Sequence, residues 1–272
     1  MANLPAADTL RSLIATLPRE CLDILEVFDE IDSTNSYLLA EDPPAPGRFR
    51  VAIANHQTAG RGRLGKHWHS SPGSGICLST SYTFQQKPEN LACLTLSVGV
   101  GVAQALQQLG AVGIELKWPN DLIVSHRKLG GILTEIHRSR SNGVTVVVGL
   151  GLNVELNGAS FAGAGEDLVD SVDLASCITA LPSRRVVSSR LIEALFYTQN
   201  EFGSKGFSNF AEVFRGFDWL RGKEISVQQP GRLATGICDG IDNDGALLLE
   251  TIRGTERIVS GSVSFAAQHN GN

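Results

Sequence analysis

The feature that most limits the folds open to this chain is a run of 24 residues, 91–114, without a single charged side chain. A run of this length could cross a bilayer as a helix. It contains Thr95, Ser97 and three glutamines, however, and from Val98 onward its apolar residues recur at helical spacing, with the glutamines mostly on another face. Because polar groups without partners are costly in hydrocarbon, we predict a half-buried helix of a globular domain and no membrane span.

Charge and cysteine content narrow the class of protein further. The 23 basic and 28 acidic residues of the 272-residue chain give a net charge of −5. This disfavours a protein whose whole surface binds nucleic acid, since such domains usually carry a basic excess. The five cysteines are odd in number and form no C-x-x-C pair, which predicts buried free thiols in a reducing compartment. The N-terminus lacks the basic and apolar regions of a secretory signal, so we expect a cytoplasmic protein.

Hydrophobic patterning predicts an α+β fold with two parts. Residues 144–154 form a continuous apolar run, typical of a central strand, and residues 121–124 and 129–136 read as a hairpin joined by residues 125–128. After Trp219 the chain changes to short strands separated by turn residues, at 223–227, 233–239, 246–250 and 257–263. The sequence Asn-Asp-Gly at residues 243–245 predicts a tight turn. We therefore predict a large domain over residues 1–220, in which helices pack on a sheet, and a small β-barrel over residues 221–272.

A loop rich in glycine and arginine lies between two predicted strands. The sequence Gly-Arg-Gly-Arg-Leu-Gly-Lys at residues 60–66 fits the dinucleotide fingerprint and nearly fits the phosphate-binding P-loop. Both motifs must open a helix, whereas residues 67–75 contain Pro72 and two further glycines. The two guanidiniums, at Arg61 and Arg63, suit a ligand that carries carboxylate and phosphate together. A basic surface loop or a nucleic-acid contact is the alternative.

Five segments, in order along the chain, resemble the biotin–protein ligases. They are residues 32–35 (Asp-Ser-Thr-Asn), 57–68 around the loop, 117–122 (Lys-Trp-Pro-Asn-Asp-Leu), 127–133 (Arg-Lys-Leu-Gly-Gly-Ile-Leu) and 149–154 (Gly-Leu-Gly-Leu-Asn-Val). Residues 240–249 also resemble the SH3-like C-terminal domain of that family. The resemblance implies a fold similar to class II synthetases, with a large mixed or antiparallel sheet and an SH3-like barrel. It implies an enzyme that uses ATP and Mg²⁺ to activate biotin as biotinyl-AMP and transfers it to a lysine of a biotin carboxyl carrier protein.

The same resemblance assigns roles to particular residues. It implies biotin binding by Ser33, Thr34, Asn35, Gln57, Gly60, Arg61, Gly62, Arg63, Lys128, Gly130 and Gly131. It implies ATP or adenylate binding by Arg63, Lys66, Trp68, Lys117, Asn120, Lys128 and Asn153. Catalysis is expected from Lys128, Arg63 and Asp121. On spacing alone Lys128 could equally be a solvated turn lysine, and Asn153 a structural asparagine at a strand end.

Asp121 admits three roles: it could hold Mg²⁺, orient Lys117, or accept the proton of the incoming lysine amine. We expect the last as its second role, because that amine must be neutral to attack. A turn residue after Pro119 is the structural alternative.

Two rival functions are less well supported. A lipoate or octanoate ligase shares the fold, but the arginine–glycine loop favours biotin. A biotin-sensing DNA-binding regulator is disfavoured by the acidic charge, and because the first motif begins at residue 32 we expect neither a helix-turn-helix domain nor DNA binding. Homodimers occur in the family, and the barrel is expected to contribute no site residues.

Overall fold

The computed structural model describes residue 4 and residues 6–140, 143–156 and 171–265. The helices are α1 (Ala7–Leu13), α2 (Thr16–Cys21), α3 (Thr34–Ala40), α4 (Leu94–Gln108), α5 (Arg184–Lys205) and α6 (Ser208–Phe217). The strands of the first sheet are β1 (Leu22–Ile31), β2 (Phe49–Gln57), β3 (Gly75–Thr83), β4 (Ile114–Lys117), β5 (Asp121–Val124), β6 (Arg127–Arg140) and β7 (Gly143–Asn153). Those of the second are β8 (Glu224–Gln229), β9 (Arg232–Ile241), β10 (Leu247–Thr251), β11 (Gly254–Ile258) and β12 (Ser262–Phe265).

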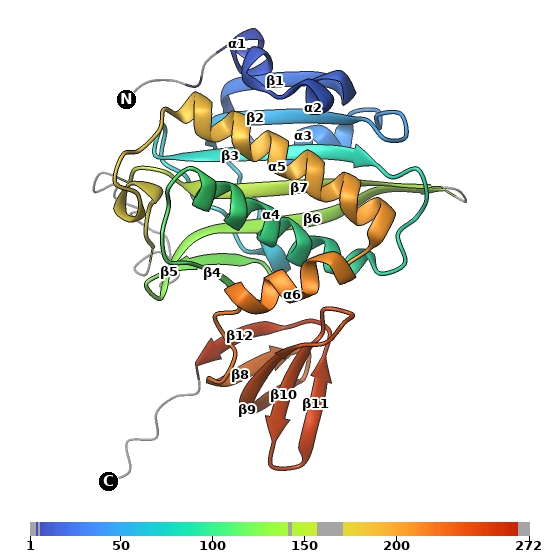
Figure 1. Ribbon diagram of the computed structural model, residues 1–272, viewed down its shortest axis with the longest axis vertical. Helices are drawn as coiled ribbons and strands as arrows, with labels where there is room; N and C mark the ends of the chain where they lie inside the picture. Colours follow the sequence, from blue (N-terminus) through green and yellow to red (C-terminus); the bar gives the residue numbers. More distant parts are fainter. Residues whose placement is uncertain (1–3, 5, 141–142, 157–170, 266–272) are drawn as a thin grey trace.

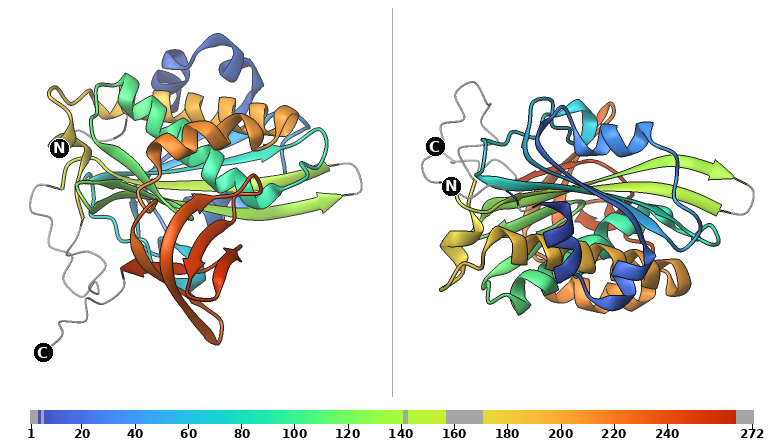
Figure 2. Two further views of the ribbon diagram at one scale, coloured as in Figure 1. Left: turned by 60° about the horizontal axis from the view of Figure 1, so that its bottom comes forward. Right: turned by 90° about the horizontal axis from the view of Figure 1, so that it is seen from above.

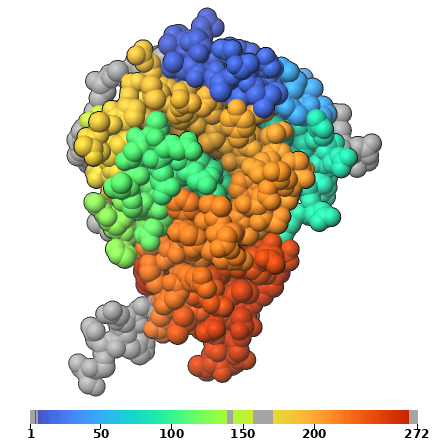
Figure 3. Space-filling model, viewed as in Figure 1, coloured from blue at the N-terminus to red at the C-terminus, as the bar shows by residue number. Residues whose placement is uncertain are grey.

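The first sheet is mixed and has helices on both faces. Its strand order is β1-β2-β3-β7-β6-β5-β4, with β1 and β2 parallel and every other pair antiparallel. Helices α1, α2, α4, α5 and α6 form a layer on one face, and α3 packs on the other (Figures 1 and 2). Figure 3 shows how completely α4, α5 and α6 cover the first face. The predicted α+β class is confirmed, and the apolar run forms β7, the middle strand of the sheet.

Strand β7 shows how the sequence separates the two faces. Val144, Val146 and Val148 point into the main core beneath the helix layer. Val147, which alternates with them, packs against α3 on the opposite face, as the two-residue period of a strand requires. Further along the strand this opposite face carries Gly149 and Gly151. These glycines leave a hollow beside α3.

The uncharged run forms a helix of the core, as predicted. Residues Leu91–Gln108 are long and apolar enough to cross a membrane, but 61% of them are buried within the fold. Helix α4 packs against α5, α6, β4 and β6. Its apolar surface is therefore covered by the protein itself.

The second sheet is antiparallel, in the order β11-β10-β9-β8-β12. The strand predicted at 257–263 is wrong: β11 ends at Ile258 and β12 begins at Ser262. Gly261 lies at this break, and a Cβ there would come within 2.6 Å of the Val227 side chain. At this break the chain crosses from one edge of the sheet to the other, where β12 pairs with β8, at the far edge from β11.

A turn of the second sheet docks onto the first domain. Gly245, with a left-handed φ of 71°, confirms the turn predicted there and accepts a hydrogen bond of 3.0 Å from the Trp118 indole. Asp244 accepts one of 2.8 Å from the Cys93 thiol. A Cβ on Gly245 would lie 2.8 Å from both Cys93 and Leu96. The contact is close enough that only glycine fits.

The five cysteines are free and four of them are buried, which confirms the prediction of buried free thiols. Burial raises the pKa of Cys77 to about 11, of Cys93 to about 12 and of Cys238 to about 11. Because the thiolate is the nucleophile, these three thiols stay neutral and unreactive at pH 8.

We expect maleimide at pH 8 to modify the partly exposed Cys21 first, as mapped by peptide mass spectrometry. Early modification of Cys77 would contradict the burial described here.

Candidate functional site

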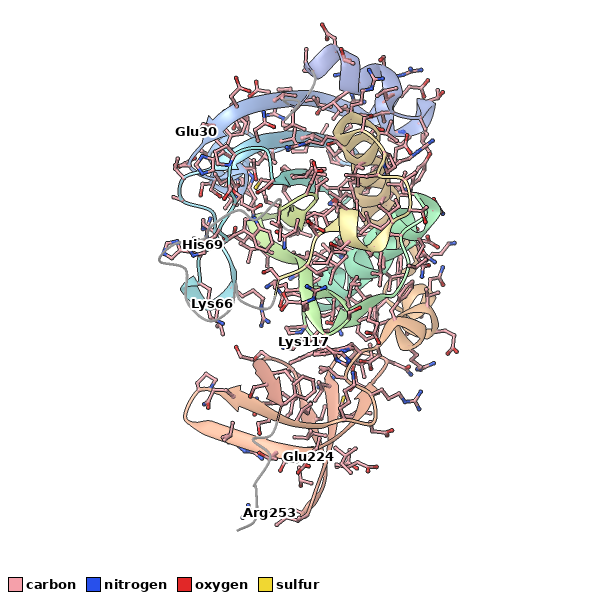
Figure 4. The ribbon with its side chains drawn as sticks, turned by 90° about the vertical axis from the view of Figure 1, so that its left-hand side faces the viewer. Glu30, Lys66, His69, Lys117, Glu224 and Arg253 are labelled. Carbon is pink, nitrogen blue, oxygen red and sulfur yellow. The ribbon has the colours of Figure 1, made fainter. Side chains whose placement is uncertain are left out.

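A cavity of about 660 Å³ opens on the α3 side of the first sheet, between the loop after β2 and the second sheet. Most of the residues predicted for the site line it: Ser33, Thr34, Asn35, Gln57, Arg61, Gly62, Arg63, Lys66, Trp68, Lys117, Asn120, Asp121, Lys128, Gly131 and Asn153. Figure 4 shows the molecule from the side, with Lys66 and His69 on the loop at the left and Lys117 beside the second sheet. Residues more than 100 positions apart in sequence therefore meet at one place.

The floor of the cavity is a row of cross-strand neighbours. Lys117 pairs with Asp121, Asp121 with Gly131, and Gly131 with Gly151. Directly paired residues project from the same face of a sheet. The row therefore places an ammonium and a carboxylate next to two positions without side chains, where a ligand can approach the backbone.

Lys128 reaches this face because of a β-bulge. The predicted connection 125–128 is wrong in length: only Ser125 and His126 form the turn, both with positive φ (49° and 63°), as a tight two-residue hairpin requires. Lys128 is thus a strand residue. The register of the β5–β6 pair shifts between Leu122 and Ile123, where β6 has one residue more than β5. Because of this extra residue, Lys128 projects from the same face as Gly131, three positions later.

The charged centre of the cavity pairs opposite charges. Lys128 Nζ lies 2.8 Å from Asp121 Oδ1. Arg63 Nη1 donates to Asn120 Oδ1 at 3.3 Å, and Asn120 is held by hydrogen bonds to Ile132 on β6. Burial lowers the pKa of the Arg63 guanidinium from its usual value, while the negative charge of Asp121 opposes that shift. The centre therefore presents two cations close to one carboxylate.

The arginine–glycine loop folds over the floor as a small hairpin. Arg61 pairs with His67, and Gly62 N donates to Lys66 O at 2.7 Å. Trp68 lies directly over Gly151, where an added Cβ would come within 2.3 Å of the indole. Lys128 Nζ lies 5.8 Å from the centre of the Trp68 ring, a cation–π distance. No helix follows the loop, which confirms that it is neither a P-loop nor a dinucleotide fingerprint.

The far end of the cavity is a network of neutral polar groups. The Gln57 side-chain oxygen accepts from both the backbone N and the hydroxyl of Thr34, each at 2.8 Å. Ser79 Oγ lies 2.6 Å from Asn35 Oδ1 and 2.7 Å from Thr34 Oγ1. Ser33 caps α3 by accepting from Ser36 N at 3.3 Å. Ser33 therefore both caps α3 and lines the cavity.

Gly149 is required for this polar end. A Cβ at Gly149 would lie 2.2 Å from Asn35 Oδ1, well inside contact distance. We expect Gly149→Ala to displace Asn35 and to weaken binding of biotin, the ligand expected at this end, by about tenfold or more, which corresponds to the loss of one or two hydrogen bonds. Isothermal titration with biotin would measure the affinity. Gly216→Ala, at an open position on α6, is the matched control, and equal affinities of the two variants would contradict the expectation.

Three predicted residues, Gly60, Gly130 and Arg61, are placed differently from the expectation, and a fourth, Asn153, lines the cavity as expected. Gly60 and Gly130 are not among the residues that line the cavity; each permits a close backbone approach, to Trp68 O (2.3 Å from an added Cβ) and to Gly151 O (2.6 Å). The Arg61 guanidinium does not turn to the charged centre but pairs with Glu135 at 2.5 Å. Asn153 uses its amide nitrogen for the carbonyls of Lys128 and Val172, so its oxygen is the atom suited to a ligand.

Several lining residues were not predicted. Ser79, Gly149 and Gly151 lie on the cavity face of β3 and β7 and could have been found from strand alternation. The expectation that the second sheet contributes nothing is wrong, since Gly261 to Phe265 line the cavity next to Trp219. The Phe265 and Trp219 rings meet edge to face at 5.1 Å. Their closeness depends on how the two sheets dock, which the sequence does not reveal.

Asp121 is the one carboxylate among the described residues that line the cavity. The described ranges hold no cluster of three or more His, Cys, Asp or Glu side chains suited to a metal ion. Mg²⁺ in nucleotide sites is commonly held by one or two carboxylates together with phosphates and water. A single carboxylate at this position fits that pattern.

Comparison with known proteins agrees with this geometry. Residues 27–153 match the model of the biotin/lipoate A/B protein ligase family, and residues 221–266 match the biotin protein ligase C terminal domain. The chain is 32% identical to the bifunctional ligase/repressor BirA of Salmonella typhimurium, over 82% of this chain and 68% of that protein. It is 32% identical to the biotin--[acetyl-CoA-carboxylase] ligase of Mycobacterium tuberculosis, over 88% of each.

A solved structure gives the same result in three dimensions. The biotin protein ligase from Aquifex aeolicus, in complex with biotin and ATP, superposes with a TM-score of 0.73 at 27% identity, covering 89% of this chain and 98% of that one. Sequence likeness, domain order and fold therefore agree over most of the length. The chain belongs to the biotin/lipoate A/B protein ligase family, among its biotin protein ligases.

Proposed function

We propose that this protein is an ATP-dependent biotin–protein ligase that joins biotin to a lysine of a biotin carboxyl carrier domain. One observation carries the proposal: a single cavity combines a closed polar end with a cationic centre. The polar end, built from Thr34, Asn35 and Gln57, offers donors and acceptors to the ureido ring of biotin. The centre, with Lys128 and Arg63, offers positive charge to a carboxylate and a phosphate.

In the first half-reaction, a biotin carboxylate oxygen attacks the α-phosphorus of ATP. The new P–O bond forms as the bond to pyrophosphate breaks, and both electrons of that bond leave with pyrophosphate. Two anions must approach each other, so fixed positive charge at the centre lowers the barrier. Lys128 and Arg63 supply this charge, with Lys66 and Lys117 at the sides of the same cavity.

In the second half-reaction, the lysine amine of the carrier attacks the activated carbonyl carbon. The C–N bond forms, the bond to AMP breaks, and AMP leaves with its electron pair. The amine loses one proton, and Asp121 is placed on the floor to accept it. The relatives from Mycobacterium tuberculosis and Paracoccus denitrificans are named as ligases that act on acetyl-CoA carboxylase, which supports this class of acceptor.

Two further assignments follow from the donor set. Asn153 accepts from the adenine amino group through its side-chain oxygen, since its nitrogen is already bound to backbone carbonyls. Asp121 is also the residue that would hold Mg²⁺, an ion that would neutralise charge on the departing pyrophosphate. In this proposal the domain of residues 1–220 carries the chemistry, the domain of residues 221–272 contributes residues 261–265 to the wall of the cavity, and the protein acts in the cytoplasm.

ATP–pyrophosphate exchange tests the proposal and its substrate class together. Exchange should require biotin and should not be supported by lipoate or octanoate at the same concentration. The ureido-sized polar end explains the preference, because both fatty acids would leave its hydrogen-bonding groups unpaired. Exchange that depends on lipoate or octanoate would assign the chain to the other branch of the family, and exchange with none of the three would refute the proposal.

A further inference from the structure

Glu135 on β6 connects the arginine–glycine loop to the polar end of the cavity. One carboxylate oxygen pairs with Arg61 Nη2 at 2.5 Å, and the other accepts from Asn35 Nδ2 at 2.9 Å. Arg61 also donates to Ser36 Oγ at 3.4 Å, at the first turn of α3. Glu135 does not line the cavity, whereas both of its partners do.

The network continues from Glu135 into the binding groups. Asn35 Oδ1 lies 2.6 Å from Ser79 Oγ, which in turn lies 2.7 Å from Thr34 Oγ1. The Asn35 amide nitrogen donates to Glu135 at 2.9 Å and, at the longer distance of 3.5 Å, to the Leu133 carbonyl, so its oxygen faces Ser79. Glu135 therefore sets which way the Asn35 amide points, a choice that decides its donors and acceptors.

Only a carboxylate can satisfy both partners. Both neighbours are donors, so the residue at this position must accept at each of its two terminal atoms. A glutamine has the same size but accepts at one atom only, and its nitrogen would face either the Asn35 nitrogen or the guanidinium. The side chain of Glu135 is 21% exposed, so the pair is shielded from water in part.

We propose that Glu135 is a positioning residue that holds the loop closed through Arg61 and orients Asn35 for biotin, so that loop closure and the biotin site are coupled. It rests on the proposed function for the identity of the ligand. Glu135 touches no reacting atom. Its effect falls on the polar end of the cavity rather than on the nucleotide end, which lies around Asn120 and Asn153.

Glu135→Gln tests the proposal, with Glu256→Gln as a matched control. Glu256 is also a part-exposed carboxylate (23%) in an ion pair with an arginine, Arg232, but lies on the second sheet. We expect the KM for biotin to rise about tenfold in Glu135→Gln, as for the loss of a charge-assisted hydrogen bond, with the KM for ATP within about twofold of wild type. Glu256→Gln should leave both KM values unchanged.

Limited trypsin digestion of the ligand-free protein gives a readout independent of the substrate. Arg61, Arg63 and Lys66 are tryptic sites within the loop, and cleavage reports how often the loop opens. We expect trypsin to cleave the Glu135→Gln variant about fivefold faster at Arg63 than the wild type, with no new early cleavage sites elsewhere in the chain, as mapped by mass spectrometry. In an Arg61→Gln background, Glu135→Gln should add little to the Arg63 cleavage rate, because the loop contact is already gone.

Two outcomes would overturn the proposal: an unchanged cleavage rate at Arg63, or equal rises in the KM for biotin and for ATP. Failure of the proposed function would look different. Wild-type protein would then show no biotin-dependent exchange, while the digestion of the ligand-free variants would still report whether Glu135 holds the loop.

Discussion

Lys128→Met is expected to slow formation of biotinyl-adenylate by about 10²–10³-fold, the usual effect of removing one group that stabilises developing charge. The substitution keeps the length of the side chain and removes its charge. It also leaves Asp121, now without its partner at 2.8 Å, as an uncompensated negative charge near the place where a carboxylate and a phosphate must meet. Both changes raise the barrier of the first half-reaction.

Single-turnover measurement of adenylate formation, with saturating biotin and ATP, checks this expectation. Lys205→Met is the matched control, because Lys205 is an exposed lysine that pairs with Glu201 on the surface of α5. The control should retain the wild-type rate. If Lys128→Met changed only the KM values and left the single-turnover rate intact, Lys128 would bind substrate without stabilising the transition state.

Much of the site could be predicted because its residues lie in short contiguous motifs. The loop at 60–68 and the segment 117–122 each bring several site residues within a few positions of one another. The apolar run of β7 also indicated a central strand, and the turn at Gly245 followed from the chemistry of glycine at positive φ. These are local properties, which depend only on residues that are close together in the sequence.

The residues that were missed or misplaced depend on non-local geometry. Lys128 reaches the cavity only because β5 and β6 shift register at a bulge, and a register shift is a property of two strands. Arg61 was expected at the charged centre, but Glu135, 74 positions away, holds it at the polar end. The lining contributed by β12 depends on the docking of two sheets. None of these relations is contained in a single stretch of sequence.

Asp121→Asn is expected to separate the two half-reactions. The asparagine oxygen can still accept from Lys128, so the cationic centre stays in place and adenylate synthesis should fall by less than about tenfold. The amide cannot take up a proton, so transfer from preformed biotinyl-adenylate to the carrier domain should fall by about 10²–10⁴-fold, the usual contribution of a general base. Rapid mixing of enzyme-bound adenylate with carrier measures the second rate, and pyrophosphate exchange reports on the first.

The same experiment distinguishes the roles that Asp121 could have. Asp239→Asn, at an exposed position of β9, is the control and should leave both rates unchanged. If Asp121 served mainly to hold Mg²⁺, synthesis would fall more than transfer, and a higher Mg²⁺ concentration would restore it in part. Equal losses in both half-reactions would contradict the role as a base and would indicate that Asp121 acts through its ion pair with Lys128 at 2.8 Å.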